Sequence, residues 1–188
     1  MKKILKIYGG AFILLISLQS CNPDDKYYSL NDEAKAFLVF DLNETFKLKK
    51  TDTDEIITLT VISKEVKFIG DGPHASGFIS FGPTADIFVE KGMYSFTDNS
   101  NCYNGEVLVI AKKDGGYVLK AHLDDCFSNS NYHYYEFYDE FFSTVDVDGI
   151  EYPNAYLLRS YPNNLYYSKE KGILKIINEY NTLFNYVE

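Results

Sequence analysis

The residues best suited to catalysis or metal binding are few and scattered in this sequence. Its three histidines, His74, His122 and His133, lie in separate segments. His122 and Asp124 would share one face of a strand, but such a pair supplies only two metal ligands. The sequence contains no Gly-x-Ser-x-Gly elbow, phosphate-binding loop or zinc-protease helix. We expect the histidines on the surface or in packing, and we predict no catalytic residue, no metal site and no cofactor.

The aromatic segment from Phe127 to Phe142 offers a different chemistry, the stacking of rings on a ligand. In a strand, one of its faces would carry tyrosines next to a carboxylate, a combination that stacks on sugar rings and hydrogen-bonds their hydroxyl groups. That face is either packed against the protein or a platform for a glycan or small hydrophobe. The predicted ligand-binding residues are Tyr132, Tyr134, Glu136 and Tyr138.

Two of the three cysteines, Cys102 and Cys126, flank a predicted hairpin. Two β-rich runs lie between them, separated by a segment with Asp114-Gly115, which is a strong hairpin signal. With these two residues as the turn, the cysteines fall within a residue or so of each other, and a bulge would place them opposite. We predict a disulfide that stabilises the fold by about 3 kcal/mol in the chain-entropy account. Neither C-x-x-C spacing nor neighbouring histidines support a metal or redox role.

The N-terminal residues 1–20 have the pattern of an export signal. Three lysines precede an apolar run from Ile7 to Leu18 that is too short to span a bilayer. The run ends in Leu18-Gln19-Ser20-Cys21, which resembles the lipobox of bacterial lipoproteins. This resemblance implies that the Cys21 thiol carries a diacylglyceryl group and becomes the new amino terminus, with two or three acyl chains as the anchor. The alternative is an ordinary secretory signal with a cysteine near its cleavage site.

The acidic stretch 22–26 that follows Cys21 has the composition of a solvated tether. It resembles the acidic export signal with which Bacteroidota send lipoproteins to the outer face of the outer membrane. This resemblance implies a protein that is lipid-anchored in the outer membrane and faces the cell exterior. Such an oxidising location agrees with a disulfide between Cys102 and Cys126.

The charge of the chain limits its partners. It has 27 acidic and 18 basic residues and a net charge of −9, and the export signal contains three of the basic residues and none of the acidic ones. A mature protein that is so acidic disfavours nucleic acid and anionic lipid head groups. The expected partners are the membrane, through the lipid on Cys21, and a glycan or an envelope protein.

The composition predicts a fold built from strands. The chain has 17 tyrosines, 14 phenylalanines and no tryptophan, with few long helical periods. We predict an all-β fold, mainly an antiparallel sandwich, roll or open barrel, with or without one short helix. The predicted regions are a signal peptide (1–20), the lipidated cysteine and tether (21–30), and a β-rich domain (31–188) that is single or divides into 31–128 and 129–188.

Alternating apolar residues predict several strands in the first half of the chain, and the segment 36–42 is either a strand or the end of a helix capped at Asn31. The predicted strands are Thr45–Leu48, one long or two consecutive strands over Ile56–Ile69, Phe78–Phe81, Asp86–Val89 and Gly92–Phe96.

Two C-terminal segments, 145–158 and 165–176, resemble the closing portion of Bacteroidota lipoproteins of uncharacterised function. The first contains Val147-Asp148-Gly149 followed by Tyr152, and the second is Tyr-Tyr-Ser-Lys-Glu-Lys-Gly-Ile-Leu-Lys from position 166. Pro153 and Ala155 depart from the usual pattern. The resemblance implies two strand segments of a β-rich domain and no catalytic residues. A C-terminal helix over 173–180 is an alternative, because its apolar positions also match a helical face.

These observations predict a lipid-anchored envelope protein that acts by binding. The alternatives are a structural or interaction protein of an envelope assembly and an undetected hydrolase. A hydrolase would require a concave pocket with two converging carboxylates or a histidine with a shifted pKa.

Overall fold

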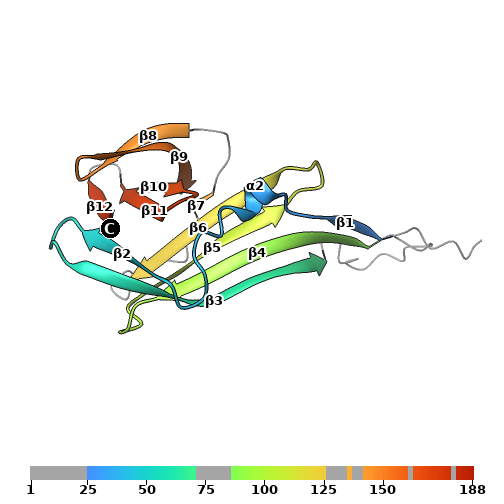
Figure 1. Cartoon of the computed structure of the whole chain (residues 1–188), viewed down its shortest axis with the longest axis horizontal. Coiled ribbons are helices and arrows are strands. Elements are labelled where there is room, and N and C mark those ends of the chain that lie inside the picture. Colours follow the sequence, from blue (N-terminus) through green and yellow to red (C-terminus); the bar gives the residue numbers. More distant parts are fainter. Residues whose placement is uncertain (1–24, 71–85, 126–134, 137–141, 161–162, 179–180) are drawn as a thin grey trace, which may run out of the picture. The chain divides into compact units, whose positions relative to one another are not determined.

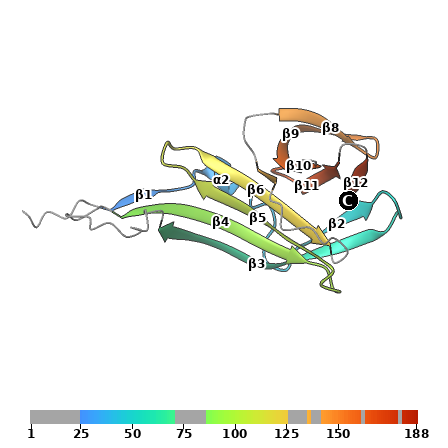
Figure 2. The same cartoon turned by 180° about the vertical axis from the view of Figure 1, so that it is seen from behind.

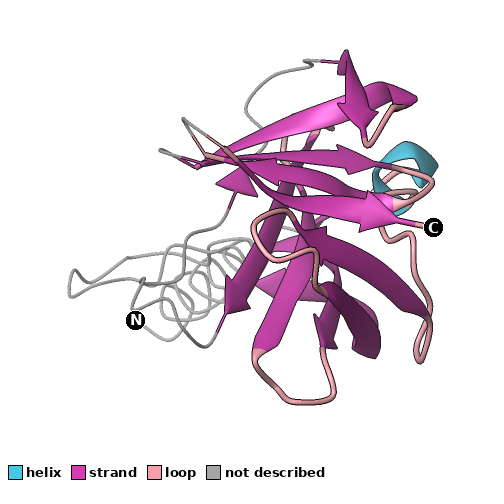
Figure 3. Cartoon of the chain, turned by 90° about the vertical axis from the view of Figure 1, so that its left-hand side faces the viewer, coloured by secondary structure: helices cyan, strands magenta, loops and turns pink. Residues whose placement is uncertain are grey.

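The computed structural model describes residues 25–70, 86–125, 135–136, 142–160, 163–178 and 181–188. Strands make up most of these residues, and the helix among them, α2, is four residues long (Figure 3). The strands belong to one 12-stranded sheet with antiparallel neighbours. The all-β prediction is therefore confirmed.

The elements in chain order are β1 (Lys26–Tyr28), α2 (Asp32–Lys35), β2 (Thr45–Lys50), β3 (Ile56–Gly70), β4 (Ile87–Thr97), β5 (Tyr103–Ala111), β6 (Tyr117–Asp125), β7 (Tyr135–Glu136), β8 (Phe142–Val147), β9 (Ile150–Ser160), β10 (Asn163–Ser168), β11 (Gly172–Ile177) and β12 (Thr182–Val187). The two strands predicted between Asp86 and Phe96 are one continuous strand, β4. The predicted strand Phe78–Phe81 lies outside the described residues.

The structure decides between strand and helix for the segments 36–42 and 173–177. Asn31 caps α2, because its side-chain oxygen accepts a hydrogen bond from the Ala34 backbone N–H at 2.8 Å. The residues after this helix form no strand before Thr45, so the capped helix is the correct alternative for the segment 36–42. At the other end of the chain, residues 172–177 form strand β11 and not a helix.

The sheet closes on itself. Its hydrogen-bonded order β4-β3-β2-β12-β11-β10-β9-β7-β6-β5 returns from β5 to β4 (Figures 1 and 2). One of these pairs joins the first and last parts of the domain, since Leu48 of β2 lies opposite Tyr186 of β12. The sequence alone did not distinguish a sandwich, a roll and an open barrel. The β4–β5 pairing is the contact that closes the sheet.

The chain divides into two compact units. The smaller comprises residues 1–27 and 70–88, and the larger comprises residues 28–69 and 89–188. In the smaller unit, the Lys26 backbone N–H donates to the Asp86 carbonyl oxygen at 2.9 Å, and the rings of Tyr27 and Phe88 stack with centroids 4.9 Å apart. The larger unit contains the main core.

The main core is built from one face of the closed sheet and the segment after α2. Phe37 of that segment is fully buried, and its ring contacts Tyr117, Tyr156 and Tyr167. The Tyr167 hydroxyl donates to the Phe37 carbonyl oxygen at 2.6 Å and lies 2.9 Å from the Tyr94 hydroxyl, which therefore donates to it. Burial raises the pKa of both tyrosines, so both hydroxyl groups stay protonated and keep this chain of hydrogen bonds.

A buried carboxylate fixes the start of the same segment. Glu90 of β4 accepts a hydrogen bond from the Leu30 backbone N–H at 2.8 Å and pairs with Lys35 at 3.2 Å. Because Glu90 is buried, these two partners satisfy a charge that would otherwise be costly. Leu30 and α2 are thereby held against β4.

The β5–β6 hairpin lies within the closed sheet. Its pairing runs from Tyr103 opposite Asp125 to Ala111 opposite Tyr117, and Gly115 has a φ of 87°. The Lys112 backbone N–H donates to the Gly116 carbonyl oxygen at 2.8 Å, and one left-handed glycine at the end of the loop is typical of a three-residue hairpin loop. The loop is 113–115, one residue longer than predicted. Cys102, which precedes the first pair, is disulfide-bonded. Cys126, the partner predicted for it, lies outside the described residues, so the pairing itself stays a prediction.

The β8–β9 hairpin has the tighter turn. Asp148 and Gly149 have φ values of 51° and 85°, and Val147 lies opposite Ile150, so these two residues form a two-residue loop. A register shift in the β8–β9 pairing leaves an extra residue in β9 at Pro153-Asn154, and Asn154 has a φ of 58°. This is a β-bulge, where proline is tolerated.

This hairpin lies over β10, β11 and β12 (Figures 1 and 2). Between the two layers is a second, small apolar cluster of Val145, Val147, Ala155 and Leu174, flanked by three tyrosines, Tyr152, Tyr166 and Tyr186. The two C-terminal segments singled out in the sequence therefore pack on each other.

Candidate functional site

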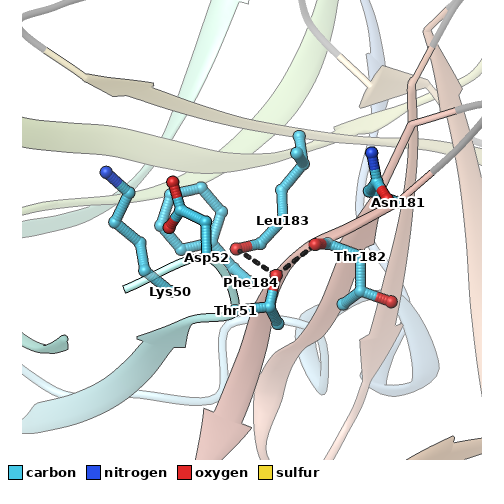
Figure 4. Close-up of a pocket in the computed structure, with 7 residues that line it drawn as sticks. All are labelled: Lys50, Thr51, Asp52, Asn181, Thr182, Leu183 and Phe184. Carbon is cyan, nitrogen blue, oxygen red and sulfur yellow. Dashed lines mark hydrogen bonds between the residues drawn. The ribbon is translucent and has the colours of Figure 1, made fainter. Parts of the chain in front are cut away.

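A pocket of the larger unit lies where β2 ends and β12 begins. Antiparallel pairing places Lys50 opposite Phe184, so the turn after β2 and the residues before β12 meet at one edge. The cavity volume is about 730 Å³. We call it the polar pocket; its lining residues are Lys50, Thr51, Asp52, Asn181, Thr182, Leu183 and Phe184 (Figure 4).

Thr51 joins the two sides of the polar pocket. Its backbone N–H donates to the Leu183 carbonyl oxygen at 3.2 Å, and its hydroxyl group donates to the carbonyl oxygen of Thr182 (Figure 4). On the opposite side, the Asn181 backbone N–H donates to the Asn178 side-chain oxygen at 2.6 Å. Backbone and side-chain hydrogen bonds thus fix both turns, which lets the remaining side chains face a pocket of defined shape.

The polar pocket has charges of both signs. Burial lowers the pKa of Lys50, but the Tyr103 hydroxyl and the carboxylates of Asp52 and Glu55 raise it above its ordinary value. The Lys50 ammonium group is therefore charged at neutral pH. With the Asp52 carboxylate, the Asn181 amide and the Thr182 hydroxyl, the lining offers both donors and acceptors next to the apolar Leu183 and Phe184.

A neighbouring side pocket extends this surface. It has a cavity volume of about 380 Å³ and shares Asn181 and Thr182 with the polar pocket. Its other walls come from β8 and from β10–β11, with Asp146 on the first and Tyr166 and Lys175 on the second. Tyr166 is half-buried and brings an aromatic ring to the surface. The two pockets together form the binding surface considered below.

A third pocket, of about 520 Å³, lies beside Cys102. Its main carboxylate, Asp98, accepts hydrogen bonds from the Ser100 hydroxyl, from the Cys102 backbone N–H at 2.8 Å and from the Tyr103 backbone N–H at 3.0 Å. Burial raises the pKa of Asp98, but these hydrogen bonds outweigh it and lower the pKa below the ordinary value. Asp98 therefore serves to fix the loop before β5.

The structure brings one predicted pair together. His122 Nε2 lies 2.8 Å from Asp124 Oδ2 on β6, as expected for alternate residues on one face of a strand. His122 is 5 % exposed, so it is a packing residue. The described residues contain no group of three or more side chains that could hold a metal ion.

The residues predicted to bind a ligand or a lipid fall mostly outside the described part. Cys21, Tyr132, Tyr134 and Tyr138 are among the residues that are not described. The Glu136 backbone belongs to β7, which pairs with Lys120 of β6 and Arg159 of β9. The tyrosine platform therefore stays a prediction.

Sequence analysis missed the residues of the polar pocket. The acidic stretch after Lys50 has the composition of an ordinary solvated turn, and Asn181 follows a strand without any motif. The two segments are joined by hydrogen bonds between residues 131 positions apart, from Thr51 to Thr182. This contact could be predicted only if the pairing of β2 with β12 were already known.

No described helix is long and apolar enough to cross a membrane. In the comparisons with known proteins, no protein-family model, no curated protein and no solved structure matches this chain.

Proposed function

We propose that this chain is an outer-membrane lipoprotein, anchored through lipid on Cys21 and facing the cell exterior, whose β domain binds a glycan without catalysis. The anchoring half of the proposal is supported by the lipobox-like residues before Cys21 and by the acidic stretch after it. The binding half is supported by the binding surface of the larger unit.

The single observation that carries glycan binding is the mixed lining of the polar pocket. Sugars present hydroxyl groups that both donate and accept, and they need partners of both kinds next to an apolar or aromatic wall. Lys50 and Asn181 donate, Asp52 accepts, and Tyr166 of the adjoining side pocket adds a ring. Among the described lining residues of the polar pocket, Asp52 is the one carboxylate and no histidine occurs, which favours binding over hydrolysis.

The test is binding of the soluble form, residues 22–188, to plant, host and microbial polysaccharides. A double variant, Asp52→Asn with Asn181→Ala, removes the charge of one side chain and the amide of another, and neither side chain makes a described hydrogen bond or ion pair. We expect its affinity to fall about tenfold or more, because each polar contact to the ligand contributes about 0.5–1.5 kcal/mol.

Two further variants locate the site. Asn104→Ala with Glu170→Gln likewise removes one amide and one carboxylate charge, at exposed positions outside the pocket, and should bind like the unmodified protein. Tyr134→Ala with Tyr138→Ala tests the tyrosine platform predicted from the sequence. Loss of binding only in this last variant would move the site to the platform, and no binding to any polysaccharide would reject the glycan proposal.

A structural role in an envelope assembly is the second candidate, and one surface favours it. Ile62 and Val66 project from one face of β3 with exposed fractions of 58 % and 45 %. Exposed apolar side chains on one strand face are a common feature of protein interfaces. Crosslinking on intact cells, with Ile62→Ser and Val66→Ser as the comparison, would reveal a partner that depends on this face.

A further inference from the structure

The β8–β9 hairpin leaves the closed sheet at one point. Residues from Tyr156 onward in β9 pair with β10, whereas the described pairs of the first half of β9 are with β8. The change occurs at the bulge next to Asn154, a non-glycine residue with a φ of 58°. Bulges bend the strand that carries them, so this residue is a natural joint between hairpin and sheet.

The contacts beneath the hairpin are modest. The apolar contact consists of Val145, Val147 and Ala155 against Leu174, with Tyr152, Tyr166 and Tyr186 packed around them. This cluster is far smaller than the main core. Few buried apolar contacts are what characterises segments that open locally while the rest of a protein stays folded.

The tip of the hairpin is held by polar contacts from three strands. Lys49 of β2 lies 2.8 Å from the Asp148 carboxylate, and the Asn185 side-chain amide of β12 donates to the same carboxylate at 2.7 Å. Lys175 of β11 donates to the Asp146 carbonyl oxygen at 2.9 Å. Lys49, Asn185 and Lys175 lie opposite one another in register, so they form one row across the sheet. The Asp148 side chain is 46 % exposed, and water therefore competes for these contacts.

Two buried polar atoms, Ser143 Oγ on the hairpin and Asn185 Oδ1 on the sheet, have no hydrogen-bond partner among the described residues. Burial of an unpaired polar atom is unfavourable, and exposure to water relieves it. The layer is also incompletely filled at its flank, where the side pocket separates Thr144 and Asp146 of the hairpin from Tyr166 of the sheet.

We infer that the β8–β9 hairpin is a lid that opens at Asn154 while the closed sheet stays intact, and that its tip contacts act as the latch. Opening uncovers Tyr166 and Tyr186 next to the row of Lys49, Asn185 and Lys175, and it enlarges the binding surface from the side-pocket end. The effect on glycan binding rests on the proposed function, whereas the opening itself does not.

Hydrogen exchange of the soluble form without ligand tests the opening. After division by the intrinsic rates, amides of residues 150–155 should exchange at least about a hundredfold faster than those of β5 and β6, with a weaker dependence on denaturant. Exchange of the hairpin only together with β5 and β6, at the same denaturant dependence, would overturn the lid.

A variant pair tests the latch. Asp148→Asn removes the charge that binds Lys49 and should accelerate exchange of the hairpin about two- to fivefold, because the pair is half-exposed. The matched control, Asp41→Asn, breaks an exposed ion pair with Lys64 (2.6 Å) and should leave the hairpin unchanged. Equal exchange of the hairpin in Asp148→Asn and the unmodified protein would reject the latch.

Glycan affinity of the same variant then tests the link to binding. With a polysaccharide identified in the array experiment, Asp148→Asn should bind at least about twofold more tightly if the open form is the competent one. Hairpin opening with unchanged affinity would separate the lid from ligand binding, while the array alone decides the proposed function.

Discussion

The two hairpins of the larger unit have the same dipeptide at their turns but lie in different surroundings. Each turns at Asp-Gly, at Asp114-Gly115 in β5–β6 and at Asp148-Gly149 in β8–β9. The first pairs on both sides within the closed sheet and presents one face to the main core. The second projects from the sheet and rests on a small cluster and three polar contacts. The difference shows that the turn specifies a hairpin, whereas its neighbours decide how firmly the hairpin is held.

The largest effect is expected from Gly105→Ala in β5. A Cβ at Gly105 would lie 2.1 Å from the His122 carbonyl oxygen and 2.7 Å from the Phe96 ring, so backbone and core must both shift. We expect a loss of about 3 kcal/mol in the free energy of unfolding, measured by urea denaturation.

Gly116→Ala is the control in the same hairpin, because its Cβ would meet only side-chain atoms, those of Asp114 at 3.3 Å and of Lys112 at 3.7 Å. The urea concentration at the midpoint of its unfolding should change little. Similar midpoints for the two alanine variants would mean that β5 and β6 tolerate displacement and that the first hairpin is no more rigid than the second.

A matched pair of valines gives the next largest effect. Val107 in β5 is fully buried in the main core, and Val147 in β8 is 2 % exposed in the hairpin cluster. Truncation of either to alanine removes the same atoms and should lower the free energy of unfolding by about 1–2 kcal/mol.

The two valine variants should differ in which amides respond. Val147→Ala should accelerate exchange of residues 150–155 about tenfold, because it weakens the hold on the hairpin directly. Val107→Ala should leave the opening of the hairpin nearly unchanged while it destabilises the whole domain. An equal response of the hairpin to both changes would mean that the two hairpins unfold as one cooperative unit.

Local sequence patterns predicted the individual strands, turns and caps of this fold better than they predicted which strands pair. The hairpin at Asp114-Gly115, the cap at Asn31 and the strand pattern from Ile56 to Ile69 are encoded by residues within a few positions of one another. The pairing of β2 with β12 has no such signal, because a strand pattern specifies which face is buried and not which strand lies alongside. The polar pocket depends on that pairing, and so it could not be foreseen.

The loop 113–115 is one residue longer than the predicted turn, and this difference changes the register of the two strands that it joins. A two-residue turn at Asp114-Gly115 would shift the position opposite Cys102 by one residue from the observed register, unless a bulge compensated for it. Asp114 does not adopt a positive φ, whereas Asp148 does, and the same dipeptide therefore closes two different loops. The flanking strands, and not the dipeptide alone, decide which one forms.

The smallest expected effect is the pH dependence of the latch. The hydrogen bond from Lys49 lowers the pKa of Asp148, burial raises it, and the charge of Lys49, the Asn185 amide and Lys175 lower it further. Lys49 in turn has a raised pKa, chiefly through its hydrogen bond to Asp148, with Asp54 contributing. Because the folded-state pKa of Asp148 lies below its unfolded value of 3.8, its contribution is fully present above that value and is lost as the pH falls through the folded-state pKa.

Opening of the hairpin, measured by exchange corrected for intrinsic rates, should therefore be constant between about pH 5 and 9 and rise below about pH 4. The rise should be about two- to fivefold at low ionic strength, since Asp148 is half-exposed and salt screens its charge. The Asp148→Asn variant should show no such rise. A transition near neutral pH would contradict the assignment of the latch to Asp148, because the pKa of this carboxyl group lies below 3.8.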